Sequence, residues 1–323
     1  MDDEFMYLGV RKPRPALLRE VRERLRGLEE TRRAPRSRWG LRLLACAASL
    51  ALVVSLSVVP SMRVGAQAFL DLFRVVNFVA LRVPNEHFAD RAREQGLDLP
   101  RMLAEQIKVL KAPSPPVSVA SPEEAGMQAG MRVLVPTWLP ADLHAQAPQV
   151  VGERAVSVTV SSQKLQRVEA AFGIDDLPVP GGIDGKTADI YTHPAVLMLY
   201  TGDHRQVQLV ESRQPQVSLP EGLDLARLAE IGLRVIGMNS ADAYQFAQQI
   251  DWRTTLVVPV PADAFDLQQV DVQGSHGLLI RRRVVINGAE VGQAQLLWST
   301  ADAVFALSGG APQELLNMAR SMQ

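Results

Sequence analysis

The residues best suited to chemistry are scattered along this chain. Histidine and acidic side chains bind metals or transfer protons when they share one helix face or one loop. No histidine has a second histidine or a carboxylate at ligand spacing on one expected helix; the five are His87, His144, His193, His204 and His276. Cys46 is the only cysteine, which excludes zinc sites built on cysteine pairs and any internal disulfide. The sequence therefore predicts no metal site and no cofactor.

Three short motifs also have structural explanations. "TGDHR", residues 201–205, is typical of a solvated hairpin tip. "PGGIDGK", residues 180–186, lacks the preceding strand and following helix of a phosphate-binding loop, so it predicts a cluster of turns. "RRR", Arg281–Arg283, lies in a region of net negative charge and indicates a local solvated patch. None of them indicates catalysis or nucleic-acid binding.

Trp252 lies in the most distinctive local sequence, "DWRTTLVVPVP", residues 251–261. A tryptophan between an acid and an arginine could form a recognition surface. At a junction between a helix and a strand, however, tryptophan is more often a core residue whose indole N–H is satisfied. We favour the core interpretation. With no catalytic motif, we expect a protein that binds rather than an enzyme.

A long apolar segment predicts on which side of a membrane these residues lie. Leu43 to Met62 are twenty residues without a charge, about the length that a helix needs to cross a bilayer. We therefore predict a transmembrane helix at 41–62. A cleaved signal ending near the "AQA" of Ala66–Ala68 is the alternative, but the long leader and Arg63 disfavour it. A buried core helix is a third, weaker alternative.

Charge predicts the orientation of this helix. Residues 1–42 hold twelve Lys and Arg against seven Asp and Glu, a net charge of +5, and the remainder carries −6. Basic residues beside a membrane span tend to stay in the cytoplasm. We expect the N-terminus in the cytoplasm, the C-terminal domain outside it, and the cell membrane as the location.

A short amphipathic helix is expected in the cytoplasm, over residues 15–33. Its apolar stripe has helical spacing and no domain of its own to cover it; the stripe consists of Leu17, Leu18, Val21, Leu25 and Leu28. A cytoplasmic partner, self-association or the membrane surface would cover such a stripe. A marginal, solvated helix is an equally weighted alternative.

The remaining pattern predicts an α+β fold. After a helix at 64–73, a strand at 73–83 and helical periodicity over 85–110, "KAPSPPVSVASP" is typical of a proline-rich link. Helices are then expected at 122–130, 162–173, 223–236, 240–250 and from Pro312. Strands are expected at 131–136, 155–161, 187–191, 195–201, 206–212, 268–273, 277–286, 291–299 and 302–308, with a hairpin turn at Asn287–Gly288.

These segments define four expected domains. They are a basic cytoplasmic tail with the amphipathic helix (1–40), the transmembrane helix (41–62), an extracytoplasmic connector with the proline-rich link (63–119) and an extracytoplasmic α+β sensor-like domain (120–323). Strands in antiparallel runs between helices predict one curved antiparallel sheet with helices against one face.

Several phrases of the last segment resemble a known family. They are "SPEEAGMQAGMRVLVPTWLP" (121–140), "GGIDGKTADI" followed by "HPAVLMLY", and "LLWSTADAVFALSGGAPQELLNMARSM" (296–322). They resemble a bacterial extracytoplasmic domain of unknown function found C-terminal to the membrane span in anti-sigma-factor-like proteins. That domain is distantly similar to periplasmic lipoprotein carriers and to regulators of sigma factors. The resemblance implies a half-open antiparallel barrel with helices on its concave face.

The resemblance implies a sensor or binding role, with no catalytic residues. The leading hypothesis is a single-pass, anti-sigma-factor-like envelope regulator that senses an extracytoplasmic ligand or partner. A sigma factor or other regulator would contact residues 15–33, which lack the His and Cys of the zinc motif common in anti-sigma proteins. The alternative is a carrier or chaperone for a lipid or lipoprotein of the cell envelope.

Overall fold

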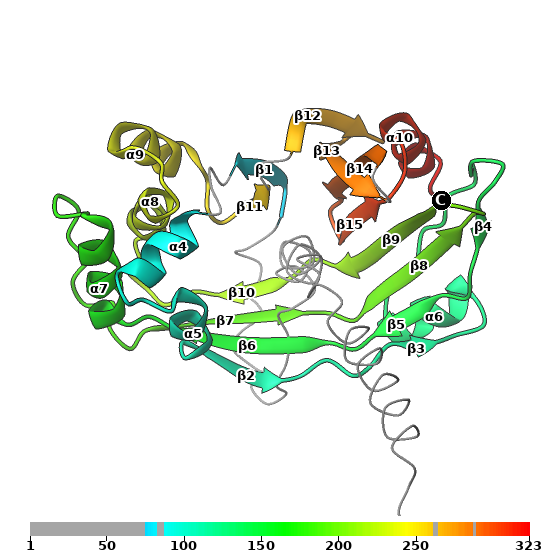
Figure 1. Cartoon of the computed structure of the whole chain (residues 1–323). Coiled ribbons are helices and arrows are strands. Elements are labelled where there is room, and N and C mark those ends of the chain that lie inside the picture. Colours follow the sequence, from blue (N-terminus) through cyan, green and yellow to red (C-terminus); the bar gives the residue numbers. More distant parts are fainter. Residues whose placement is uncertain (1–74, 83–86, 261–263, 287–288) are drawn as a thin grey trace, which may run out of the picture. The chain divides into compact units, whose positions relative to one another are not determined.

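A large antiparallel sheet lies between layers that come from both ends of the described part of the chain. The structure, a computed structural model, describes residues 75–82, 87–260, 264–286 and 289–323 (Figure 1). The expected helices at 15–33, 41–62 and 64–73 and the turn at 287–288 lie outside the described residues. Among the helices that the structure describes, none has the length and apolar character needed to cross a bilayer.

The large sheet has nine strands, all paired antiparallel. In spatial order they are β12 (Ala264–Val272), β13 (Ser275–Ile286), β14 (Ala289–Ser299), β15 (Ala303–Ser308), β9 (Gln206–Arg213), β8 (Ala195–Thr201), β5 (Gln149–Val151) and β3 (Val117–Ser118), and β4 (His144–Ala145) pairs with β8. The sheet is not closed, because β12 and β3 form its two ends. The predicted α+β class with a large antiparallel sheet is confirmed.

Both faces of this sheet are apolar. One face carries the main core, in which α6 (Pro122–Ala129) and α10 (Pro312–Arg320) pack against strand residues such as Val196, Leu209 and Phe305. The other face carries a second cluster that includes Phe78, Val258 and Ile280. A strand buried on both faces must be apolar throughout, and the first five residues of β15, "AVFAL", are all buried.

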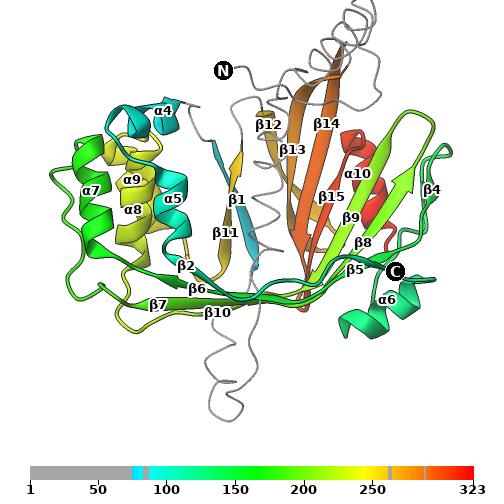
Figure 2. The same ribbon diagram turned by 60° about the horizontal axis from the view of Figure 1, so that its bottom comes forward.

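The second cluster is covered by strands. β1 (Asn77–Arg82) and β11 (Thr255–Val260) form a two-stranded parallel pair. Figure 2 shows this pair beside the large sheet. Phe78 of β1 and Val258 of β11 are buried there, and the Gln269 side chain of β12 donates a hydrogen bond to the Phe78 carbonyl oxygen at 2.9 Å. The strand expected at 73–83 is confirmed over residues 77–82.

A second antiparallel sheet has four strands. It consists of β10 (Gln216–Ser218), β7 (Thr187–Thr192), β6 (Arg154–Thr159) and β2 (Ile107–Lys111) in that order. β1 and β2 precede the domain boundary expected near residue 119, yet they pair with β11 and β6, which follow it. Hydrogen bonds therefore join strands from the two sides of that boundary.

The remaining helices are α4 (His87–Glu94), α5 (Leu99–Ala104), α7 (Ser162–Phe172), α8 (Leu225–Val235) and α9 (Ser240–Gln249). Their caps explain where they begin and end. Ser161 and Asn239 accept hydrogen bonds from Lys164 N and Asp242 N, and left-handed Gly173 ends α7. Serine and asparagine are favoured at the start of a helix, and glycine just after its end. Two small apolar clusters, around Ile231 and Leu233, lie where these helices pack.

Two sequence predictions were wrong. The end of the helical pattern at 107–111 is strand β2, because pairing with β6 overrides its weak helical periodicity. The strand expected at 131–136 has no ladder; one isolated bridge joins Pro136 to Met322. Residues 131–139 instead run across the main core, with Met131, Leu134 and Leu139 packed against it. We call residues 131–139 the strap.

Gly309 lies in the turn between β15 and α10, and substituting it tests the conformation of this turn. Its φ is +102°, and an added Cβ would lie 2.2 Å from the carbonyl oxygen of Gln206. We expect Gly309→Ala to lower the free energy of unfolding by about 2 to 4 kcal/mol, measured from the denaturant midpoint of tryptophan fluorescence. Gly292→Ala is the control, since a Cβ there meets nothing within 4 Å. Equal midpoints for the two variants would contradict this account of the turn.

Candidate functional site

A cavity of about 340 Å³ is the best candidate for a binding site in the described part of the chain. Its walls come from residues 217, 219–223 and 225, which run from β10 to the start of α8, and from residues 250–253, which join α9 to β11. This volume lies near the lower end of the range of about 300 to 1,000 Å³ for small-molecule sites. A compact ligand would fit it.

Trp252 forms part of one wall. Its indole Nε1 donates a hydrogen bond to the carbonyl oxygen of Ala247 at 2.8 Å, and the ring packs against the cluster around Leu233, Ala243 and Ala247. The core interpretation of Trp252 is therefore confirmed, but the side chain also lines the cavity. Because its N–H already has a partner, the ring offers a ligand only apolar surface.

Asp251 fixes the turn that presents Trp252. Its carboxylate accepts hydrogen bonds from the Arg253 backbone N–H at 3.0 Å and from the Thr254 hydroxyl at 2.9 Å. The backbone carbonyl of Asp251 also accepts from Thr254 N and Thr255 N. The turn between α9 and β11 is thus held by local hydrogen bonds, so this wall of the cavity is formed in advance of any ligand.

The opposite wall is held by a lysine from a distant turn. Lys186 Nζ donates a hydrogen bond to the carbonyl oxygen of Glu221 at 2.6 Å. Gly222 beside it has φ +69°, a conformation that favours glycine. Lys186 ends the motif "PGGIDGK", which is a set of turns, as the sequence predicted. Its contact with the cavity wall could not be predicted from spacing, because 35 residues separate the two partners.

The cavity lining is suited to an apolar group. Leucine, isoleucine, valine, proline and tryptophan side chains supply most of the lining. The charged side chains Glu221, Asp251 and Arg253 belong to exposed residues, so they can face water while the apolar residues enclose a ligand. This arrangement is typical of sites that bury an apolar body and leave polar groups at the edge.

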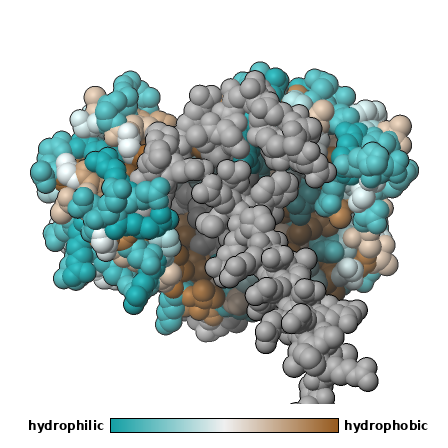
Figure 3. Space-filling model, viewed as in Figure 1, coloured by the Kyte–Doolittle hydropathy of each residue, from teal (hydrophilic) through white to brown (hydrophobic). Residues whose placement is uncertain are grey.

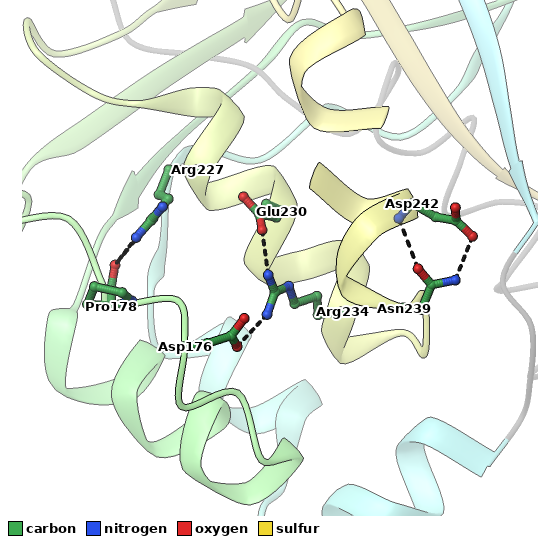
Figure 4. Close-up of polar contacts among 7 residues, drawn as sticks. All are labelled: Asp176, Pro178, Arg227, Glu230, Arg234, Asn239 and Asp242. Carbon is green, nitrogen blue, oxygen red and sulfur yellow. Dashed lines mark hydrogen bonds and ion pairs between the residues drawn. The ribbon is translucent and has the colours of Figure 1, made fainter. Parts of the chain in front are cut away.

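A charge network anchors α8 near this region (Figure 4). Arg234 donates to Glu230 at 2.7 Å and to Asp176 at 2.6 Å. The hydrogen bond from Arg234 holds the pKa of Asp176 below its usual range. The Glu230 side chain is only 3% exposed, so its charge depends on this guanidinium. The network fixes α8 against the segment after α7. It contains no nucleophilic side chain, so we assign it a structural role.

A second group of titratable side chains lies at the end of β7. The Tyr191 hydroxyl donates to Glu153 at 2.8 Å, and Lys111 forms an ion pair with the same carboxylate. Burial raises the pKa of Tyr191 to about 12 and lowers the pKa of His193 to about 4. The two rings meet edge to face. Neither pKa is near neutrality, so the group is poorly matched to acid–base catalysis at neutral pH.

The expected site residues can now be placed. The stripe Leu17, Leu18, Val21, Leu25 and Leu28 lies outside the described residues. Among those described, no group of three or more His, Cys, Asp or Glu residues could hold a metal ion. The "TGDHR" tip is more than a solvated turn, because Arg205 pairs with Asp142 and with Glu314 of α10. The three side chains hold the hairpin, the segment before β4 and the last helix together.

Exposed apolar residues also occur on β2. Figure 3 shows a small hydrophobic patch over this strand, where Ile107 and Val109 are exposed. β2 is an edge strand of its sheet, with exposed Lys108 and Lys111 and a register irregularity after Val109. Lysines and bulges are devices that protect edges from pairing with other chains. We therefore interpret β2 as a protected edge.

Comparison with known proteins does not assign the chain to a family. No protein-family model and no curated protein matches the chain. Among solved structures, the chain aligns with the crystal structure of a bifunctional dehydratase-cyclase domain in ambruticin biosynthesis, at 10% sequence identity and a TM-score of 0.10, covering 57% of this chain and 99% of that one. A TM-score this low carries no argument about fold or function.

Arg234 and Arg227 make a matched pair for testing the network. Arg234→Met leaves the buried Glu230 carboxylate without its partner, so we expect a loss of about 3 kcal/mol in the free energy of unfolding. Arg227 lies on the same helix, and its guanidinium donates long hydrogen bonds of 3.4 Å to the Pro178 carbonyl. Arg227→Met should therefore cost less than about 1 kcal/mol. Glu230→Gln in the Arg234→Met background should recover part of the loss; no recovery would contradict the assignment.

The cavity can be tested with an apolar fluorescent probe. We expect 1-anilinonaphthalene-8-sulfonate to bind the full chain in lipid nanodiscs, with energy transfer from Trp252 and with empty nanodiscs as background. Leu223→Glu places a carboxylate in the lining, which repels the sulfonate, and should weaken binding by about tenfold. Met127→Glu is the control, since Met127 is exposed on α6 and outside the cavity. The same affinity in all three proteins would rule out binding in this cavity.

Proposed function

We propose that the chain is a single-pass membrane protein whose extracytoplasmic domain senses a compact apolar ligand, or an apolar segment of an envelope partner. The observation that carries this proposal is the cavity beside Trp252, whose lining residues are mostly apolar and include three exposed charged residues. The chain would act as an anti-sigma-factor-like envelope regulator. Ligand binding outside would be reported to a cytoplasmic protein.

The sequence supports the placement in the membrane. The twenty uncharged residues from Leu43 to Met62 follow a basic segment, as expected for a helix with its N-terminus in the cytoplasm. The described domain would then lie outside the cytoplasm. Its only contact with the inside would be this helix, so residues 1–40 would carry the signal.

The inner contact would be the stripe of Leu17, Leu18, Val21, Leu25 and Leu28. Apolar residues at helical spacing suit an amphipathic helix that lies in the groove of a partner. A sigma factor or another cytoplasmic regulator is the proposed occupant. The stripe is short, so we expect a modest affinity that a change in the outer domain could alter.

We also propose that the large sheet is of the half-open-barrel type that the resemblance implies. The open order of strands, with α6 and α10 against one face, supports this assignment. In that arrangement the helices would lie on the concave side. The ligand cavity is separate from this face, since it is lined by residues after β10 and around Trp252.

Co-purification of the full chain tests the proposal. Expressed in its host with a C-terminal tag, the chain should resist carbonate extraction from membranes, expose the tag to external protease, and retain a specific regulator. A variant with Val21→Asp and Leu25→Asp should lose the regulator because charges enter the apolar stripe. Glu23→Ala, on the polar face, should keep it.

Two outcomes would contradict the proposal. A water-soluble product, or a tag protected from external protease, would refute the topology. A chain that co-purifies with stoichiometric lipid and no regulator would indicate a carrier instead of a sensor.

A further inference from the structure

Glu211 is a buried carboxyl in the middle of the main core. It lies on β9, where its backbone pairs with Val196 of β8 and Phe305 of β15. It points to the same face as Leu209, two residues before it in the strand, and Leu209 belongs to the main core. The residue is 1% exposed. An acid in such a place has lost almost all contact with water.

The carboxyl has a single hydrogen-bond partner among the described residues. Oε2 accepts from the backbone N–H of Leu134 in the strap at 3.0 Å, whereas Oε1 is buried without any partner there. A buried charge with one partner is costly, because the rest of its hydration is not replaced. The neutral acid is therefore the form that suits this site.

Among the described residues no cation acts on the pKa of this carboxyl, and Arg213, two residues along β9, is exposed. The titratable group that interacts with it is Tyr200 on β8, whose pKa is raised by burial and, to a lesser extent, by Glu211. β15 carries no titratable side chain, and Glu314 of α10 is paired with Arg205. Other elements that pack nearby also carry charged groups. Arg132 of the strap is exposed, and Arg320 of α10 donates to the Asp271 carbonyl. α6 carries Glu123 and Glu124, which are acids. Burial raises the pKa of Glu211 to about 8, although the Leu134 hydrogen bond acts in the opposite direction.

The strap that contacts Glu211 is held mainly at its far end. Val135 and Gln323 exchange two backbone hydrogen bonds of 3.2 Å, and Thr137 N donates to Ser321 O at 3.2 Å. Trp138 N donates to the Ser321 hydroxyl at 3.1 Å. The strap belongs to no strand ladder. Its backbone hydrogen bonds run to residues 321–323 and to Gly126, so the strap can open without breaking a ladder of the large sheet.

We propose that Glu211 makes the strap a pH-sensitive cover of the main core. The neutral carboxyl keeps the strap closed over the sheet. When the carboxyl loses its proton, the closed form holds an uncompensated charge, and the open strap lets the carboxylate reach water. The device goes beyond ligand sensing, because it needs neither the cavity nor the N-terminal segment.

The direction of the effect follows from the two pKa values. The carboxyl has a pKa of about 8 when closed and an ordinary value near 4.5 when the open strap exposes it. Between these values the closed form binds a proton that the open form releases. The equilibrium constant for opening should then rise about tenfold per pH unit over that range and level off above it.

Hydrogen exchange of the full chain in nanodiscs tests the proposal. Mass spectrometry of peptides spanning 131–139, from pH 5.5 to 9, gives protection factors that are corrected for intrinsic exchange chemistry. In the wild-type chain the protection factor should fall about tenfold per pH unit up to about pH 8. In Glu211→Gln, which keeps the size of the side chain without its charge, protection should not depend on pH.

Two controls isolate Glu211. Tyr200→Phe removes the neighbouring titratable group, and Glu123→Gln removes an exposed carboxylate on α6; both should retain the pH dependence. If Glu211→Gln fails to fold, infrared difference spectroscopy of the wild-type chain gives a second measurement. A carboxylic acid band should disappear around pH 8 together with strap protection. Protection that is independent of pH in the wild type, or an equal fall in Glu211→Gln, would overturn the proposal.

Discussion

The structure depends on one constraint, which is that the central strands of the large sheet are apolar on both faces. Such a sheet must be covered twice. One cover consists of α6, α10 and the strap, and the other of β1 and β11. β1 opens the described part of the chain and α10 closes it, so segments from both ends must be in place before the core is complete. Long-range pairings of this kind explain why strands before residue 119 share sheets with strands after it.

The candidate binding site lies outside this double core. Loop and helix ends line the cavity, and local hydrogen bonds at Asp251 and a contact from Lys186 hold its walls. Binding residues commonly sit on connecting segments that a rigid scaffold positions. A ligand at this site would therefore contact residues after β10 and around Trp252 without disturbing the burial of the large sheet.

Two buried glutamates show how charge is managed in this fold. Glu230 lies 2.7 Å from Arg234, and that guanidinium compensates its charge. Glu211 has only a backbone N–H and an apolar environment, and burial raises its pKa to about 8. The same residue type is thus a fixed part of a charge network in one place and a protonated acid near neutral pH in the other. The difference is the presence of a cationic partner, since a buried carboxylate without one is destabilised.

Much of the local structure follows from the sequence by itself. The alternating patterns of the last four strands predicted their elements, because such signals act between near neighbours. Ser121, Asn239 and left-handed Gly173 also have the residue types that are favoured at helix ends. Trp252 was likewise predicted as a core residue. The tertiary structure alone decided that residues 131–139 form a strap instead of a strand, that 107–111 pair as β2, and that residues about 30 positions apart enclose one cavity. It also buried Glu211, whose one hydrogen-bond partner among the described residues is a backbone N–H. Each of these outcomes depends on which distant segment covers a residue, and periodicity and capping carry no information about that.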